Sequence, residues 1–172
     1  MSEETKNKSD YVAETTVILL GKLSNNSTFG KNMLSLLRKS FATGEEDPEA
    51  LGWMFSQIPE EISGKGGYMS REEKAIYITL CIYAECRGKF SRGQDFIIAA
   101  KEAEITQKRL LEIEIANDLE ELKYPLCLLI HYISEKGFGI DYVGLARDLT
   151  VFQYDRGQVI RKWARKYALA NH

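Results

Sequence analysis

Four cations and two aromatic residues near the C-terminus form the group of side chains best suited to bind a ligand. The group consists of Arg161, Lys162, Trp163, Arg165, Lys166 and Tyr167. From residue 156 to residue 172 there are five lysines and arginines and no acidic residue, although the whole chain has a net charge of −2. A cluster of cations in an otherwise acidic chain is typical of a surface that attracts phosphate groups. The alternative is that the cations are only solvated and the aromatic residues only fill the core.

Two helices must position this group. Asp141 follows two glycines and precedes an apolar run, so its carboxylate is expected to cap a helix in which Tyr142, Leu145 and Leu149 face inward. Arg147 and Asp148 are expected on the opposite side of that helix. Asp155 can cap a second helix, whose apolar stripe is Val159, Ile160, Trp163 and Tyr167. The pattern predicts a helix pair with aromatic residues inside and cations outside.

The residue types needed for catalysis or metal binding are scarce. His131 and His172 are the only histidines, so no Ser–His–Asp or Cys–His set can be assembled without His131. No acidic loop has the spacing of a metal site, and the glycine-rich loop at 63–67 lacks the rest of a phosphate-binding motif. The cysteines Cys81, Cys86 and Cys127 lie in apolar runs, which favours buried thiols over a disulfide or zinc. We therefore expect no catalysis, no metal and no cofactor.

The composition is that of a globular protein in the cytoplasm. The chain has 172 residues, 44% of them hydrophobic and 28% charged, which is enough for one domain or two small helical subdomains. No apolar run is long enough to span a membrane, and the polar N-terminus has no signal-peptide core.

Helical periodicity dominates the chain. It predicts helices at 11–23 and 29–41, a short helix that begins at Pro48 and stops before Pro59, and helices at 94–104 and about 123–136, with Pro125 in the first turn of the last one. Four more helices are expected after the caps Ser70, Thr106, Asp141 and Asp155. Ser70 and Glu73 form a capping box before the apolar run 75–84. The predicted fold is all-α, a compact bundle of about eight or nine helices that can be divided into two packed subdomains at 10–104 and 105–172. Residues 1–9 are expected to be disordered.

Several short motifs are shared with a known family. They include Leu37-Arg38-Lys39-Ser40, Lys108-Arg109-Leu110-Leu111, Ile140-Asp141-Tyr142, Arg147-Asp148-Leu149 and the segment from Arg161 to Tyr167. With these motifs the chain resembles the CasB family, the small subunit of the type I-E CRISPR surveillance complex Cascade. The resemblance implies an all-helical, non-catalytic protein, present as a pair beside CasA, repeated CasC subunits and a guide RNA. It also implies sequence-independent contacts to the backbones of the target and non-target DNA strands.

The resemblance and the charge pattern together indicate which residues bind nucleic acid. Lys31, Arg38 and Lys39 lie on one predicted helix, and Lys108 and Arg109 begin another. Arg161, Lys162, Arg165 and Lys166 are added on charge more than on motif. His131 stands where the family has an arginine that faces DNA, which weakens the expected binding through that helix. Arg147 has two alternatives, a phosphate contact or an ion pair with a neighbouring acid.

Two other functions fit the sequence. The segment 145–166 has the length of a helix-turn-helix DNA reader, but its turn lacks glycine and Trp163 is bulky for an exposed reading helix. The other is a helical scaffold that binds only proteins. Preference for one duplex sequence would favour the first of these, and a complex without any nucleic-acid contribution would favour the second.

Overall fold

The computed structural model describes residues 6–87 and 89–170, and these residues form an all-α fold, as predicted. The elements in order are α1 Lys8–Ser24, α2 Thr28–Thr43, α3 Pro48–Gln57, the short 3₁₀ helix η1 Glu60–Ile62, α4 Arg71–Cys86, α5 Phe96–Glu102, α6 Gln107–Glu114, α7 Leu119–Glu135, α8 Tyr142–Phe152 and α9 Arg156–Leu169. No strand occurs in the described ranges, where two isolated β-bridges join loop residues. None of the helices within them has the length and apolar character needed to cross a membrane.

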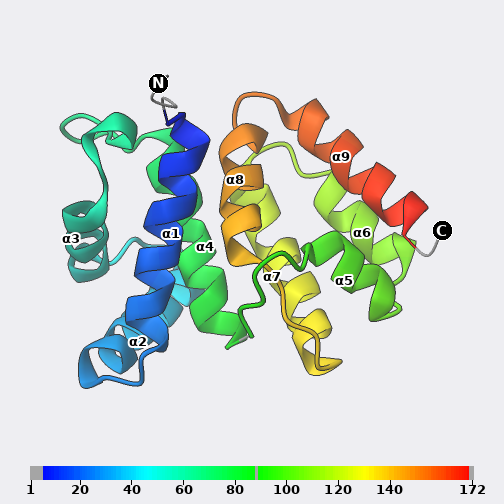
Figure 1. Cartoon of the computed structure of the whole chain (residues 1–172), viewed down its shortest axis with the longest axis horizontal. Coiled ribbons are helices and arrows are strands. Elements are labelled where there is room, and N and C mark those ends of the chain that lie inside the picture. Colours follow the sequence, from blue (N-terminus) through cyan, green and yellow to red (C-terminus); the bar gives the residue numbers. More distant parts are fainter. Residues whose placement is uncertain (1–5, 88, 171–172) are drawn as a thin grey trace, which may run out of the picture.

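The helix α4 lies at the centre of the N-terminal half and contacts α2, α7 and α8. Its residues Ala75, Ile76, Leu80 and Ile82 are fully buried, which agrees with the apolar run that the sequence shows there. In Figure 1, α8 stands between α1 and α4 on one side and the helices α5, α6, α7 and α9 on the other. The later part of the chain therefore supplies a helix that packs directly on the earlier part.

Side-chain caps begin the helices where the sequence places them. Ser70 Oγ accepts from the Glu73 backbone N–H, and Glu73 Oε1 accepts from the Ser70 N–H, which confirms the capping box of α4. Asp141 and Asp155 cap α8 and α9 as predicted. Gly44 ends α2 in the left-handed conformation with φ 74°.

The start of α7 differs from the prediction. The helix begins at Leu119 rather than near Lys123, so Pro125 lies inside the helix and not in its first turn. Asp118 Oδ1 caps the helix by accepting from the Glu121 N–H at 2.9 Å, and Leu119 and Leu122 are buried. This cap and the buried leucines offset the backbone hydrogen bond that proline cannot donate.

The division of the chain into two subdomains at 104/105 stays a prediction. The contacts of α5 indicate on which side of such a boundary this helix would belong. Helix α5 precedes the predicted boundary but packs on α7 and α9, which follow it. Disorder was expected for residues 1–9. Residues 1–5 lie outside the described residues, and Lys8 and Ser9 form the start of α1.

Candidate nucleic-acid interface

Helix α9 is held in place through its tryptophan. Trp163 is fully buried, and its ring packs against Phe96 of α5 and Phe152 of α8 at centroid distances of 5.2 and 6.2 Å. The indole N–H donates to Asp148 Oδ2 at 2.9 Å. Asp148 is buried, with 6% of its surface exposed. The prediction that it lies on the outer side of α8 is therefore wrong. The reason is that a buried indole needs a hydrogen-bond acceptor, and α8 supplies one.

Two of the four predicted α9 cations are in ion pairs within the chain. Lys162 Nζ lies 2.5 Å from Asp148 Oδ1, and Lys166 Nζ lies 2.5 Å from Asp95 Oδ2. Arg161 and Arg165 are exposed and have no acidic partner among the described residues. The charge that α9 offers to a ligand is therefore carried mainly by the two arginines.

The outer face of α2 presents cations that have no partner within the described part of the chain. Lys31 and Lys39 are exposed and Arg38 is half-buried, while Met33 and Leu37 of the same helix are in the core. None of the three cations makes a side-chain hydrogen bond or an ion pair to a described residue. Cations left without an internal acid keep their charge available for phosphate.

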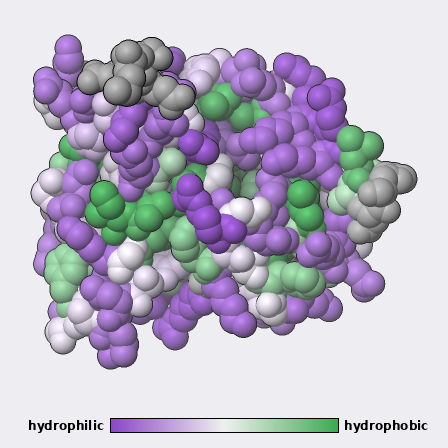
Figure 2. All heavy atoms as spheres, viewed as in Figure 1, coloured by the Kyte–Doolittle hydropathy of each residue, from purple (hydrophilic) through white to green (hydrophobic). Residues whose placement is uncertain are grey.

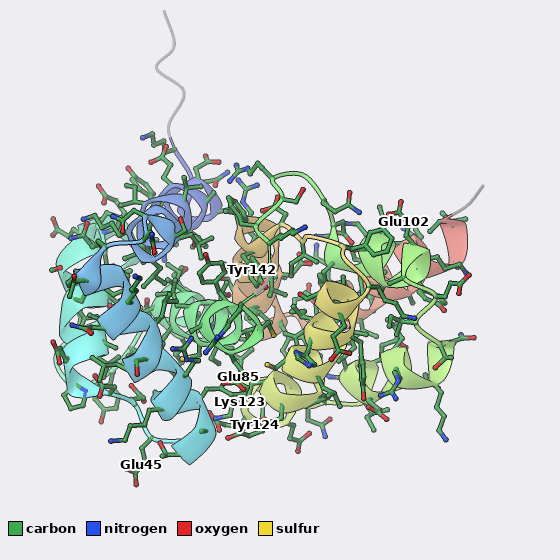
Figure 3. The ribbon with its side chains drawn as sticks, turned by 90° about the horizontal axis from the view of Figure 1, so that it is seen from below. Glu45, Glu85, Glu102, Lys123, Tyr124 and Tyr142 are labelled. Carbon is green, nitrogen blue, oxygen red and sulfur yellow. The ribbon has the colours of Figure 1, made fainter. Side chains whose placement is uncertain are left out.

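Helix α7 lies between α2 and α6. Its Tyr124 packs edge-on against Phe41 of α2 at 5.0 Å and donates a hydrogen bond to the Phe41 carbonyl at 3.3 Å. Figure 3 shows Tyr124 and Lys123 at this meeting point. Lys123 is half-buried and pairs with Glu120 at 2.8 Å. α7 also packs on α6, so this helix contacts the C-terminal end of α2 through Tyr124 and Arg109 of α6 through Tyr132.

The α6 cations differ in how they are held. Lys108 is exposed, whereas Arg109 is half-buried and its guanidinium lies 4.1 Å from the centroid of the Tyr132 ring of α7. This cation–π contact fixes the arginine without neutralising it. Sequence reasoning did not single out Tyr132, because no local signal links two residues on different helices.

His131 and Arg147 are both paired with acids. His131 Nε2 lies 3.0 Å from Glu135 Oε1 one turn along α7, with the histidine side chain about half exposed. Arg147 lies 3.6 Å from Asp10 and donates to the Ser9 carbonyl at 3.4 Å, which is the ion-pair alternative. Both residues are therefore less available to bind a phosphate than the α2 cations, which have no acidic partner among the described residues.

The buried thiols match the sequence prediction. Cys81, Cys86 and Cys127 are all free and buried, and the Sγ atoms of Cys86 and Cys127 are 3.5 Å apart. The hydrogen bond between these two thiols, together with burial, raises the pKa of Cys86. Burial raises the pKa of Cys81 to about 12. Such thiols are poor nucleophiles and poor metal ligands at neutral pH, and no group of three or more metal-ligating side chains occurs among the described residues.

Taken together, these features define a class: an all-helical protein whose cations lie on the outer faces of separate helices around a well-packed core. Residues 33–167 match the family described as CRISPR-associated protein Cse2, and the chain therefore belongs to this family, whose members are also called CasB. No curated protein sequence matches it.

Solved structures of CasB proteins share the fold. The chain is similar to CasB from Thermus thermophilus, with a TM-score of 0.71, 20% identity and coverage of 95% of this chain and 99% of that one. It is also similar to CasB from Thermobifida fusca, with a TM-score of 0.67, 16% identity and coverage of 92% and 96%. CasB from M. ruber gives a TM-score of 0.66, 19% identity and coverage of 90% and 92%.

Proposed function

We propose that this CRISPR-associated protein is the non-catalytic small subunit of a Cascade complex in the cytoplasm and that it holds DNA strands of the R-loop by their backbones. In such a complex, base pairing with the guide RNA reads the sequence, and protein cations hold phosphates without reading bases. The expected partners are CasA, CasC, the guide RNA, both DNA strands and a second copy of the chain.

The observation that carries this proposal is the unpaired cationic face of α2. Lys31, Arg38 and Lys39 have no internal acid among the described residues. Arg38 and Lys39 lie within the range 33–167 that matches the family, and Lys31 precedes it. A helix face that retains three free charges in a chain of net charge −2 can attract a polyanion without making the whole protein basic.

The cations of α6 extend the proposed surface. Arg109 is held on the ring of Tyr132, and Lys108 is exposed beside it. Because α7 contacts both α2 and α6, we propose that one strand passes over α7 and meets both groups. His131 of α7 already lies 3.0 Å from Glu135.

The test is the salt dependence of R-loop stability in the reconstituted complex. We expect the triple variant Arg38→Ala, Lys39→Ala, Arg109→Ala to shorten the R-loop lifetime. We also expect it to reduce the slope of log affinity against log salt by about 2 to 3, since each lost phosphate contact removes about 0.7–0.9.

A matched control removes three other lysines. Lys8, Lys65 and Lys74 are exposed and unpaired to described acids, and their replacement by alanine is expected to leave the slope unchanged. Native mass spectrometry of each complex separates failed assembly from weakened strand binding. An unchanged slope in a fully assembled triple variant would refute the proposal.

A further inference from the structure

A groove of about 680 Å³ runs along α9 between this helix, α8 and α5. Its apolar surface comes from Ile98 of α5, Val151 of α8 and Leu169 of α9. Ile98 and Leu169 are 37% and 59% exposed, so these side chains line an open surface rather than a closed core. Figure 2 shows apolar atoms among the hydrophilic ones at this end of the molecule, near the C-terminus.

The rim of the groove is cationic. Arg161, Lys162, Arg165 and Lys166 all line it, and the spacing of four residues places Arg161 and Arg165 on the same face as Leu169. The two lysines are held by Asp148 and Asp95 at 2.5 Å. The groove therefore presents two guanidinium groups that have no acidic partner among the described residues, above an apolar floor.

This combination fits a nucleic-acid strand poorly. A surface that binds single strands usually combines cations with exposed aromatic rings on which bases stack. None of the described residues that line this groove has an aromatic ring. The nearby Tyr167 ring is covered by Lys101 Nζ at 4.3 Å, and its hydroxyl donates to the Ile105 carbonyl. A phosphate backbone would leave the aliphatic floor in contact with water or charge.

The same combination fits an acidic amphipathic peptide. A helix laid in a groove buries apolar side chains at a spacing of three or four residues, and carboxylates one turn apart can pair with arginines one turn apart. We propose that the α9 groove docks an acidic amphipathic segment of a partner protein. In this arrangement its carboxylates pair with Arg161 and Arg165 and its apolar side chains cover Ile98, Val151 and Leu169.

The proposal is independent of strand binding by α2 and α6, and the isolated chain can test it. The probe is a helix-forming peptide of about 15 residues with leucine at helical spacing and glutamate on both flanks. A second peptide has glutamine in place of every glutamate, and an oligothymidylate of about 12 nucleotides serves as the nucleic-acid competitor. The readout is the NMR signals of the labelled methyl groups of Ile98, Val151 and Leu169.

We expect the glutamate peptide at about 1 mM to shift these three methyl signals. The glutamine peptide should bind roughly tenfold more weakly, because each exposed ion pair contributes up to about fivefold. Arg161→Gln with Arg165→Gln should cause the same loss, and Lys65→Gln with Lys74→Gln should cause none.

Two results would overturn the proposal. One is the absence of methyl shifts with the glutamate peptide when the spectrum shows a folded protein. The other is stronger binding of oligothymidylate at the same methyl groups, lost in the double arginine variant, which would assign the α9 cations to nucleic acid instead.

Discussion

Trp163 and Asp148 form a buried hydrogen bond of 2.9 Å between the indole Nε1 of α9 and the carboxylate Oδ2 of α8. The other oxygen of the carboxylate accepts from Lys162 Nζ at 2.5 Å. Asp148 therefore contacts both the buried Trp163 between α8 and α9 and Lys162 on the rim of the α9 groove. The pairing follows from burial, since an indole N–H without an acceptor in the core is costly.

Replacing Asp148 tests this link. We expect Asp148→Ala to lower the free energy of unfolding by about 2–3 kcal/mol, because it leaves the buried indole N–H without an acceptor. Asp148→Asn should cost less, since the amide oxygen can still accept from the indole. Chemical denaturation measures both variants. Glu14→Ala removes an exposed pair with Lys6 and is expected to change the free energy of unfolding far less, because solvent screens exposed ion pairs. Equal losses for Asp148→Ala and Glu14→Ala would contradict this account.

Glu73 holds the loop that precedes α4. It is 4% exposed, and its Oε1 accepts from the Gly64 and Ser70 N–H groups at 2.7 and 2.8 Å. Glu73→Ala should therefore lower the free energy of unfolding by about 2–3 kcal/mol. Glu72 stands in the same first turn but makes no side-chain hydrogen bond to a described residue. If Glu72→Ala were as costly in thermal or urea unfolding, the helix dipole rather than the cap would be the source of the effect.

Cys81 makes stability depend on pH in the alkaline range. Burial raises the pKa of its thiol from 9.0 to about 12, so the unfolded chain loses this proton first. Below pH 9 the Cys81 thiol is protonated in both states and its contribution to the free energy of unfolding is complete. Between about pH 9 and 12 this contribution falls by up to about 1.4 kcal/mol per pH unit. Urea unfolding across this range should show a shallower fall for Cys81→Ala than for the unaltered chain. If the free energy of unfolding fell equally with pH in both proteins, Cys81 would not be the source of the pH dependence.

Tyr132 is expected to position Arg109 for phosphate binding. The guanidinium lies 4.1 Å from the ring centroid, a contact that phenylalanine can also make. In the assembled complex, Tyr132→Phe should leave the R-loop lifetime unchanged, and Tyr132→Ala should shorten it by about three- to tenfold at equal subunit composition. Rescue by Arg109→Lys in the alanine variant would argue against a positioning role, because a lysine does not restore the lost contact.

Local signals predicted most of the fold. Ser70, Asp141 and Asp155 cap helices from neighbouring positions, and a cap is a property of residues within one turn. The exception is α7, where Pro125 suggested a later start than the one that Asp118 sets. The cost of a proline inside a helix can be predicted from the local sequence. The stabilisation from burying Leu119 and Leu122 cannot, because it depends on the packing of the rest of the molecule.

The candidate site was less predictable, because charge pairing is not local. Lys166 pairs with Asp95, which lies 71 residues earlier, and Arg109 rests on a tyrosine of the next helix. The sequence shows where cations occur but not which of them are neutralised. The structure distinguishes the free cations of α2 from the paired lysines of α9.

The placement of α8 has a consequence for synthesis of the protein on the ribosome. Helix α8 packs on α1 and α4, and Leu145, Ala146 and Leu149 are fully buried or nearly so. Until α8 has been translated, α1 and α4 must present the apolar faces that it later covers. The nascent chain is therefore open to chaperones, and to aggregation, for most of its elongation. Any rare codon or pause before residue 142 prolongs that exposure, so the rate of translation through this region bears directly on the yield of folded protein.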